Sequence, residues 1–564
     1  MSAKALRITV LGGGPGGLSL CHYLRQALGD SVELTLVEKS ERVGGWLHSE
    51  RRDGFLFERG PHSFRPSTPA GRVVLELVDA LGLRDAAIAP PKSAGKRFLW
   101  LDGKLQEVAP TWRTPIGRTL LKGALRDLVT PRREVPDDAP RTAEEFRELE
   151  AMLASARTPR VRSAIRALLA SGDESVADFV GRRFGTDVAE QAADAMISGI
   201  FAGDARRLSA RSCFPLLPEL ERDYRSVVWA MLRRSVLKFG GGGGGGAKPK
   251  PKPVEQTAKQ SVDGKREAWL DEMAATSQVS FREGMETLGH GLAESFTAGG
   301  ARSRLLTGRV AVSLDSLDSL DGELGGSNGN GDGGAVDVRI AAVDGGAEEE
   351  TIRADYVFST LPSIALAELL PERGAAGAGV AAVRRSLSEA PTVSVGVVNL
   401  GYDEGGLLPH EGVGHLIPSR EWEAALGVIW SSSVFPQQAE NERGETRLTV
   451  MVGGAHAHQA EALALHSETE LIEHAQSIVS KHLGVTREPS AAIGGVLRDC
   501  LPQYTLGHKS RLDELEAALA QHCPRLKAIG NSLYGVGIAD TIATARRTAE
   551  AFAAEQQHRD GSGV

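Results

Sequence analysis

At 564 residues the chain is too long for one compact core, so two or three packed units are expected. Its composition, 41% apolar and 24% charged with a net charge of -8, is that of a globular protein without a basic face, which excludes nucleic acid as a partner. Its four cysteines, Cys21, Cys213, Cys500 and Cys523, show no paired spacing, so neither a metal site nor a disulfide framework is predicted.

The first predicted elements form a dinucleotide-binding turn. Residues 6–28 have the pattern of a buried strand, a glycine turn and an amphipathic helix. Gly12, Gly14 and Gly17 satisfy G-x-G-x-x-G. The first glycine permits the tight turn, the second lets a pyrophosphate approach the backbone, and the third lets helix pack on strand. The pyrophosphate would then lie at the N-terminus of the helix.

A second predicted strand, residues 32–37, ends in Glu38. A carboxylate at this spacing can accept hydrogen bonds from the hydroxyls of an adenosine ribose. Arg42 and the pair Gly44-Gly45 follow, and this second stretch of bare backbone beside a cation favours FAD, the longer cofactor, over NAD. A glycine turn without function next to a surface arginine is the alternative interpretation.

The pattern changes in the middle of the chain. Between residues 115 and 234, apolar positions recur every three to four residues, which predicts a helix-rich region. From 393 to 452, short β-branched runs separated by glycine and proline turns predict an antiparallel sheet. No run of 18 apolar residues occurs, so any membrane contact is expected to be peripheral.

Two low-complexity stretches interrupt these regions. A run of glycines at 240–246, followed by alternating lysine and proline, predicts a flexible surface insertion. A Gly/Asn/Asp-rich stretch at 322–334 lies between two β-like runs, 309–314 and 336–343, and predicts an expanded hairpin tip. Neither stretch is assigned a function.

Two later segments are expected to join the nucleotide-binding domain. Residues 354–362 form a predicted buried strand that would close the nucleotide sheet. The glycine-rich segment 530–540 precedes a predicted helix at 542–554, so glycine again meets the start of a helix. Alone, this segment is an ordinary loop before an amphipathic helix, and only its combination with the N-terminal turn gives it weight.

These motifs resemble the flavoprotein superfamily that includes amine oxidases, phytoene desaturases and protoporphyrinogen oxidases. The superfamily signature is matched by Glu38-x-x-x-Arg42-x-Gly44-Gly45. The segments that look like the protoporphyrinogen oxidase family in particular are Gly45-Trp46, residues 57–66 (FERGPHSFRP), 198–204 with Leu208-Ser209, 431–436 (SSSVFP) and 501–508 (LPQYTLGH). The resemblance covers most of the chain, and the two low-complexity stretches and Asn531 depart from it.

The resemblance implies a fold that combines α/β and α+β architecture. Its expected units are a Rossmann-like FAD-binding domain built from residues 1–95, 278–365 and 496–564, a mostly helical membrane-associating domain at 96–234, a flexible insertion at 235–277, and a substrate-binding domain with a mixed or antiparallel sheet at 366–495. A plain helical lid is the alternative for the helical unit.

The resemblance also implies that FAD is bound without a covalent bond. The residues that it assigns to the cofactor are Gly12, Gly13, Gly14, Pro15, Gly16, Gly17, Glu38, Lys39, Arg42, Gly45, Trp46, Gly60, Pro61, His62, Ser63, Val310, Asn531, Val536, Gly537 and Ile538. The N-terminus of the last helix would face the pyrimidine edge of the flavin, where the helix dipole can stabilise a reduced, anionic ring.

Four residues are assigned to the substrate in the same way. Arg97 would pair with a propionate of the tetrapyrrole, since a guanidinium offers two parallel donors to a carboxylate. Leu416 and Phe435 would sandwich the macrocycle, and Gly199 would let it lie close to backbone. The alternatives are a cation–π arginine, core packing of the two apolar residues, and a helix C-cap glycine.

The implied activity is that of an FAD-dependent oxidase acting on CH–CH groups. Protoporphyrinogen IX would be oxidised to protoporphyrin IX in haem biosynthesis, with FAD as hydride acceptor and molecular oxygen as terminal oxidant. No catalytic acid or base is marked in the sequence. The eukaryotic family further implies a peripheral location at the mitochondrial inner membrane, and the short stretch before residue 6 leaves no room for a cleavable presequence. A homodimer is left open.

Two other functions remain as alternatives. The first is another FAD-dependent oxidase or desaturase of the amine oxidase or carotenoid desaturase type. The second is a non-catalytic binder on the same fold, of the kind that inhibits GDP dissociation from small GTPases. Flavin colour in the purified protein separates the binder from the enzymes.

Overall fold

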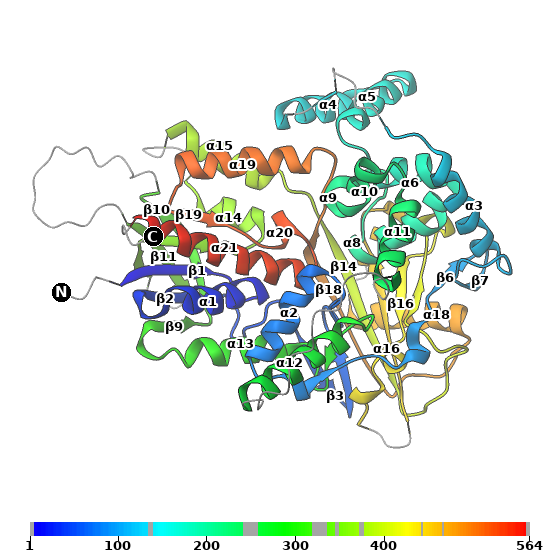
Figure 1. The fold of residues 1–564 in the computed structure, drawn as a ribbon, viewed down its shortest axis with the longest axis horizontal. Coiled ribbons are helices and arrows are strands. Elements are labelled where there is room, and N and C mark those ends of the chain that lie inside the picture. Colours follow the sequence, from blue (N-terminus) through cyan, green and yellow to red (C-terminus); the bar gives the residue numbers. More distant parts are fainter. Residues whose placement is uncertain are drawn as a thin grey trace, which may run out of the picture.

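The computed structural model describes residues 5–133, 139–140, 142–240, 258–317, 335–344, 349–371, 377–440, 444–464 and 467–559. Figure 1 shows two halves side by side, one built on a five-stranded sheet and the other on a seven-stranded sheet capped by helices. The expected combination of a Rossmann-like parallel sheet, a mixed sheet and a helical region is confirmed. The hairpin tip at 322–334 and residues 241–246 of the glycine run lie outside the described residues.

The five-stranded sheet is entirely parallel, in the order β19-β13-β1-β2-β9. Its strands are β1 (Leu6–Leu11), β2 (Val32–Val37), β9 (Ser303–Leu306), β13 (Tyr356–Ser359) and β19 (Leu526–Ala528). The strands predicted at 6–11 and 32–37 are confirmed. The strand predicted within 354–362 is confirmed as β13, which joins the sheet beside β1, but it is not the edge of the sheet, because β19 pairs along its outer side.

Both faces of this sheet are covered, as a parallel sheet requires. The helices on one face are α1 (Pro15–Leu28), α2 (Pro69–Ala80), α12 (Ala258–Ala274), α13 (Glu286–Thr297) and α21 (Ile538–Arg559). The elements on the other are the antiparallel strands β10 (Arg309–Asp315), β11 (Val336–Ala342) and β12 (Glu350–Ala354), with helices α14 (Ser363–Leu369), α15 (Gly377–Ser388) and α19 (His508–His522). Val10 faces the first layer and Leu11 the second, because side chains alternate along a strand.

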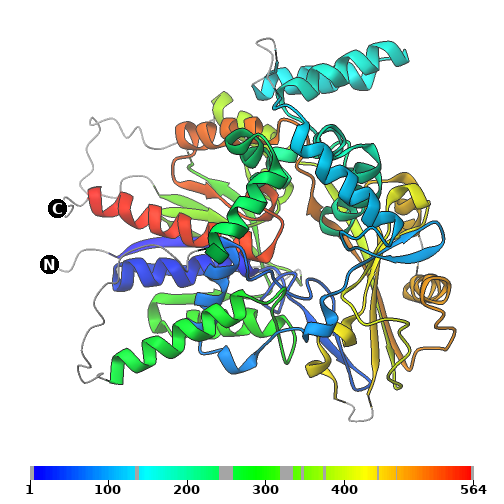
Figure 2. The same cartoon turned by 45° about the vertical axis from the view of Figure 1, so that its right-hand side comes forward.

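Two expectations from the sequence concern this half of the molecule. The antiparallel pairing of β10 with β11 confirms the predicted hairpin strands. The insertion expected at 235–277 is wrong at its C-terminal end, because residues 258–274 form α12, which packs against α2 through Arg72 and Asp271. Figure 2 shows α21 lying alongside α1, so the first and last described helices share one core.

The seven-stranded sheet is mixed, in the order β18-β14-β17-β16-β15-β6-β7. Its strands are β6 (Phe98–Leu101), β7 (Lys104–Glu107), β14 (Thr392–Tyr402), β15 (Gly414–Leu416), β16 (Ala425–Ile429), β17 (Thr446–Gly453) and β18 (Ala491–Pro502). All neighbours are antiparallel except β15 and β6. Helix α18 (Glu468–Leu483) covers one face.

The antiparallel sheet predicted at 393–452 is confirmed, but two expected boundaries differ from the structure. The boundary after residue 495 falls inside β18, because that whole strand pairs with β14. The unit expected to be helical from residue 96 begins with β6 and β7, which form an edge of the seven-stranded sheet. Two short antiparallel pairs complete the strands: the hairpin of β3 (Ser49–Arg52) with β4 (Phe55–Glu58), and the long-range pair of β5 (Ala87–Ile88) with β8 (Ser280–Phe281).

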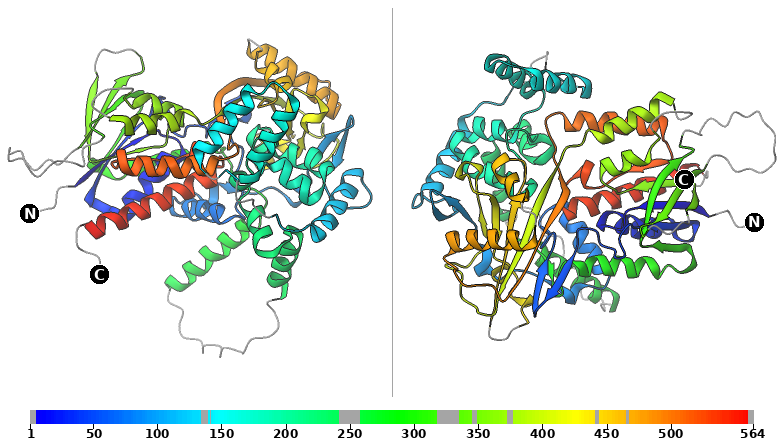
Figure 3. Two further views of the ribbon diagram at one scale, coloured as in Figure 1. Left: turned by 90° about the horizontal axis from the view of Figure 1, so that it is seen from above. Right: turned by 180° about the vertical axis from the view of Figure 1, so that it is seen from behind.

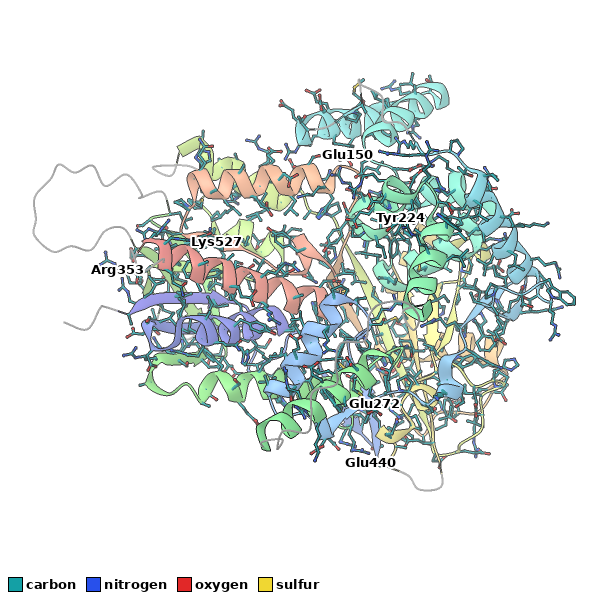
Figure 4. The ribbon with its side chains drawn as sticks, in the orientation of Figure 1. Glu150, Tyr224, Glu272, Arg353, Glu440 and Lys527 are labelled. Carbon is teal, nitrogen blue, oxygen red and sulfur yellow. The ribbon has the colours of Figure 1, made fainter. Side chains whose placement is uncertain are left out.

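The predicted helix-rich region is confirmed. Its main helices are α3 (Pro115–Val129), α4 (Ala143–Ser155), α5 (Pro159–Gly172), α6 (Val176–Phe184), α8 (Asp194–Phe201), α9 (Ala210–Cys213), α10 (Leu216–Tyr224) and α11 (Val227–Gly240). Threonines Thr114, Thr142 and Thr158 cap the first three by accepting a backbone N–H. Figure 3 shows the α4–α5 hairpin projecting beyond the other helices, and Figure 4 labels Glu150 on it. Across the described ranges, no helix has both the length and the apolar character needed to span a bilayer.

Candidate active site

The N-terminal glycine turn is packed too closely for side chains. Gly12 has φ of 100°, and a Cβ atom on Gly17 would overlap the Gly12 carbonyl oxygen. A Cβ atom on Gly45 would lie 3.0 Å from Gly14 Cα, so the second glycine turn rests on the first. The Gly44 N–H donates to Gly13 O at 2.8 Å and fixes this contact. Two stretches of bare backbone therefore form one cradle.

Glu38 and Arg42 hold the cradle in shape. The Glu38 carboxylate, 9% exposed, accepts the N–H of Gly13 at 2.6 Å and that of Ser40 at 2.8 Å. A carboxylate has further lone pairs, so these bonds leave it able to accept a ribose hydroxyl. Arg42 was expected to contact the cofactor, but its guanidinium donates to the carbonyl oxygens of Gly45 at 2.6 Å and Leu47 at 3.2 Å. Its role in the structure is to brace the second turn.

The last segment of the chain meets the first turn. A Cβ atom on Gly16 would lie 3.0 Å from Thr541 Cγ2 in α21. Thr360, at the end of β13, donates from its hydroxyl to Leu11 O at 2.9 Å, and a Cβ atom on Gly530 would lie 3.3 Å from its carbonyl oxygen. The turns at 12–17 and 530–538 are therefore adjacent in space, as binding of one dinucleotide by both requires.

The other residues assigned to the cofactor lie around this cradle with different exposures. Lys39 is exposed and Trp46 is 41% exposed. Pro15 begins α1, and Asn531 begins the short helix α20 (Asn531–Tyr534). The strand that carries Val310 begins beside Glu38, whose carbonyl accepts the Arg309 N–H at 3.0 Å. Val536, Gly537 and Ile538 lead into the N-terminus of α21.

The segment 60–63 passes next to the cradle. A Cβ atom on Gly60 would overlap Trp46 O, and after Pro61 the Ser63 hydroxyl donates to Gln278 at 2.7 Å. His62 Nε2 is buried and has no hydrogen-bond partner among the described residues. Burial, and next the charge of Arg447, lower the pKa of His62 to about 4, so the ring is neutral at pH 7.

His62 borders a small polar cavity of about 10 Å³, which sequence reasoning missed. The cavity is lined by Leu56, Phe57, Glu58, His62, Asn399, Ser431, Gln438, Arg447 and Thr449. Arg447 is 2% exposed and pairs with Glu445 at 2.5 Å. Burial raises the pKa of Glu58 to about 8, although Met285 N–H and the Ser49 hydroxyl donate to its carboxylate. The sequence signal that could have revealed this cavity is the charged pair Glu445 and Arg447 at the start of a largely apolar β run.

Among the substrate residues, Gly199 and Leu416 are brought together. A Cβ atom on Gly199 would lie 3.1 Å from Leu416 Cδ1, and one on Gly427 would lie 3.1 Å from Leu416 Cδ2. Gly199 lies inside α8, whose C-cap is Ala202, so the alternative of a C-cap glycine is wrong. Because Gly199 and Gly427 have no side chains, there is room for Leu416 between them.

Arg97 and Phe435 are placed differently. Arg97 directly precedes β6, which pairs with the strand of Leu416, and its exposed guanidinium makes no ion pair with any described residue. Phe435 is 3% exposed and packs with Ile88 and Val413, in a different apolar cluster from Leu416. Leu416 and Phe435 therefore do not contact each other, and their expected placement on either side of the macrocycle stays a prediction.

A further apolar surface lies at the C-terminal end of α8. Ala202, at the end of α8, packs against the sheet with partly buried Val393, Met451 and Leu501. Sequence reasoning missed these residues because alternation alone does not tell which face of a strand meets a distant helix.

The cradle fits a flavin dinucleotide on the evidence of its own atoms. It offers backbone without Cβ atoms over two turns, a helix N-terminus at Pro15, and a buried ring nitrogen without a partner at His62.

The description "flavin containing amine oxidoreductase" belongs to the family model that matches residues 15–552. The chain belongs to this family and is a flavin-dependent oxidoreductase, which argues against the non-catalytic alternative. A protoporphyrinogen oxidase of Bos taurus is 33% identical over 96% of this chain and 97% of its own. A coproporphyrinogen III oxidase of Bacillus subtilis is 26% identical over the same shares. The resemblance predicted from the motifs is confirmed.

Solved structures share the fold. A protein from Exiguobacterium sp. 255-15, provisionally assigned as a protoporphyrinogen oxidase, has a TM-score of 0.65 at 22% identity and covers 98% of this chain and 100% of its own. Cyclohexylamine oxidase from Brevibacterium oxydans IH-35A has a TM-score of 0.58 at 14% identity with the same coverage. At these identities the likeness concerns the fold alone.

Proposed function

We propose that the chain oxidises protoporphyrinogen IX to protoporphyrin IX with FAD as hydride acceptor and molecular oxygen as final oxidant. The observation that carries this proposal is the contact between the first and last glycine segments, at Gly16 and Thr541, in a chain that matches a protoporphyrinogen oxidase over 96% of its length. It supports one extended cofactor bound by both ends of the fold.

When bound, FAD supplies the electron acceptor for dehydrogenation. The glycine cradle and the N-terminus of α1 would bind its pyrophosphate, and Glu38 would orient its ribose. Gly537 and Ile538, at the N-terminus of α21, would face the ring, where the positive end of the helix dipole would favour negative charge. The chain's contribution is to bind and orient, because none of its described side chains is marked as the acid or base.

The substrate would lie between the cradle and the seven-stranded sheet. Arg97 offers a charged fork to a propionate at the rim, and this pairing is supported by its exposure and by its lack of an ion pair in the described chain. Leu416 and Gly199 offer an apolar contact to the macrocycle and keep water from it. Arg97 would thus set the orientation of the macrocycle, while the apolar contact would set how deeply the macrocycle enters the site.

Anaerobic mixing of the purified protein with protoporphyrinogen IX tests the proposal. The yellow flavin absorbance should bleach, and porphyrin fluorescence should grow further when air is admitted. Coproporphyrinogen III is the matched substrate, since it carries more carboxylates and a Bacillus subtilis relative bears its name. Bleaching by coproporphyrinogen III alone, or a colourless protein, would contradict the proposal.

We further propose that the helical region rests on a membrane surface. Helix α3 exposes apolar side chains, Leu125 at 66% and Val129 at 81%, beside basic ones such as Lys122, and Trp112 just before it is 71% exposed. An amphipathic helix with cations flanking apolar residues binds anionic lipid interfaces. The expected mitochondrial location and a homodimer stay predictions.

Sedimentation with vesicles measures this second proposal. The wild-type protein should sediment with vesicles that contain anionic lipid, and the variant Leu125→Asp/Val129→Asp should stay in the supernatant. The same variant should keep its flavin and its activity in detergent. Equal sedimentation of the two proteins would contradict a role for α3.

A further inference from the structure

The segment 503–508 contacts both the helical region and the glycine loop before α21. The Gln503 side chain donates to Phe201 O at the end of α8 at 2.7 Å, and Gly507 N–H donates to Asp173 at 2.9 Å. Leu506 packs with the α4–α5 hairpin. Between them, Tyr504 is 3% exposed and reaches the glycine loop before α21.

The Tyr504 hydroxyl lies inside what would be a helical hydrogen bond. It donates to the carbonyl oxygen of Asn531 and accepts the N–H of Gly535 at 2.7 Å. These two groups are four residues apart, so they would bond to each other if α20 continued for another residue. A side chain inserted into the i to i−4 ladder interrupts a helix. Here it ends α20 and frees Gly535 to adopt φ of 127°.

The ring of Tyr504 is anchored in the helical region. It belongs to the apolar cluster of α6, α8 and α10, lies edge-on to Phe201 at 6.2 Å, and its carbonyl oxygen accepts the Ser209 N–H at 2.8 Å. His508 stacks on the ring at 4.2 Å, and its Nε2 lies 3.1 Å from Leu533 O. Burial raises the pKa of Tyr504 and lowers that of His508 to about 4, so both side chains stay neutral hydrogen-bonding groups.

We propose that Tyr504 is a positioning residue, which holds residues 531–535 in the interrupted form that places the start of α21 against the flavin. This inference rests on the proposed function for the presence of the flavin. Because the same ring packs in the helical cluster, the seating of the helical region sets the geometry of the flavin loop. Without the hydroxyl, the Gly535 N–H can close on Asn531 O, and the backbone of Gly537 and Ile538 shifts with it.

The test compares Tyr504→Phe with Tyr402→Phe in the flavin-loaded protein. Phenylalanine keeps the contacts with Phe201 and His508 and removes only the hydroxyl. Tyr402 is the matched control, because it is 1% exposed and its hydroxyl has no hydrogen-bond partner among the described residues. The readouts are the rate at which FAD fluorescence appears after dilution, the flavin absorption spectrum, and kcat and KM for protoporphyrinogen IX.

For Tyr504→Phe we expect FAD release to accelerate about tenfold, with a shifted flavin spectrum and a lower kcat, while KM stays within about twofold. Tyr402→Phe should match the wild type. FAD release at the wild-type rate from Tyr504→Phe, or equal acceleration in both variants, overturns the proposal.

Two further outcomes are separable. If Tyr504→Phe does not fold, the variant His508→Phe tests the proposal instead, because it keeps a ring stacked on Tyr504 but loses the hydrogen bond to Leu533 O. FAD release about threefold faster than in the wild type supports the proposal. An unchanged release rate overturns it. A wild-type protein that binds FAD but leaves protoporphyrinogen IX intact defeats the proposed function, while the release rates still decide on Tyr504. A wild-type protein without flavin defeats both.

Discussion

The half built on the five-stranded sheet and the helical region place their functional groups by different means. In the first, the atoms that form the glycine cradle are backbone atoms, brought together by the absence of side chains at Gly14, Gly17 and Gly45. In the helical region, the fold depends on buried charges: Arg183 and Asp127 are both 0% exposed and paired, and Arg183 also contacts Glu221 at 3.0 Å. The comparison teaches that substitutions should fail differently in each, by steric exclusion in one and by loss of charge compensation in the other.

The largest effect is expected at the glycine turn. In Gly17→Val the new side chain would overlap Gly12 O, so flavin binding should fall by more than about 100-fold. The measurement is the flavin absorbance of the purified protein. Gly264→Ala is the control, because nothing lies within 4 Å of its Cβ position in α12, and it should keep its flavin and gain up to about 1 kcal/mol. A yellow Gly17→Val protein would break the steric half of the comparison.

Arg183→Met probes the other half. Removing one member of a fully buried ion pair should lower the free energy of unfolding by about 3–5 kcal/mol. Hydrogen exchange should show the loss in α3 and α10, with the flavin still bound. Arg222→Met, at an arginine whose side chain is 61% exposed, should change stability by less than about 0.5 kcal/mol. Faster hydrogen exchange in both halves of the Arg183→Met protein would contradict the view that the two halves are stabilised independently.

The ionisation of Glu58 makes the free energy of unfolding depend on pH. Its pKa is raised from 4.5 to about 8 in the folded state, so folding favours its protonated form. Its stabilising contribution is therefore present below about pH 4.5 and is lost as pH rises to about 8, a change of a few kcal/mol. Denaturant titrations at pH 5 and pH 8 should show this loss in the wild type and a flatter profile in Glu58→Gln. Parallel profiles would sink the assignment.

Substitution of Arg97 should give the smallest effect, which should be confined to substrate binding. Arg97→Met should raise KM for protoporphyrinogen IX about 10- to 100-fold, the value of one charge-assisted hydrogen bond, and leave kcat nearly unchanged. Lys104→Met, on the neighbouring strand β7, is the charge-matched control and should leave KM unchanged. A loss of kcat without a change in KM would place Arg97 elsewhere in the mechanism.

The same contrast explains what the sequence could predict. The glycine turn and Glu38 were found because their steric requirement is local and has a fixed spacing. The pairing of β18 with β14 and the position of Phe435 were not found, because they depend on which face of a strand meets a partner about 100 residues away. Arg183 and Asp127 are 56 residues apart, and an arginine in a helix gives no sign of its partner.

The contact between Gly16 and Thr541 has a consequence for how the molecule is made. Helix α21 is synthesised long after α1, so α1 must wait for its partner while the sequence between the two helices is translated. Both segments can bind the cofactor only after α21 has left the ribosome, so insertion of the cofactor must follow the synthesis of α21.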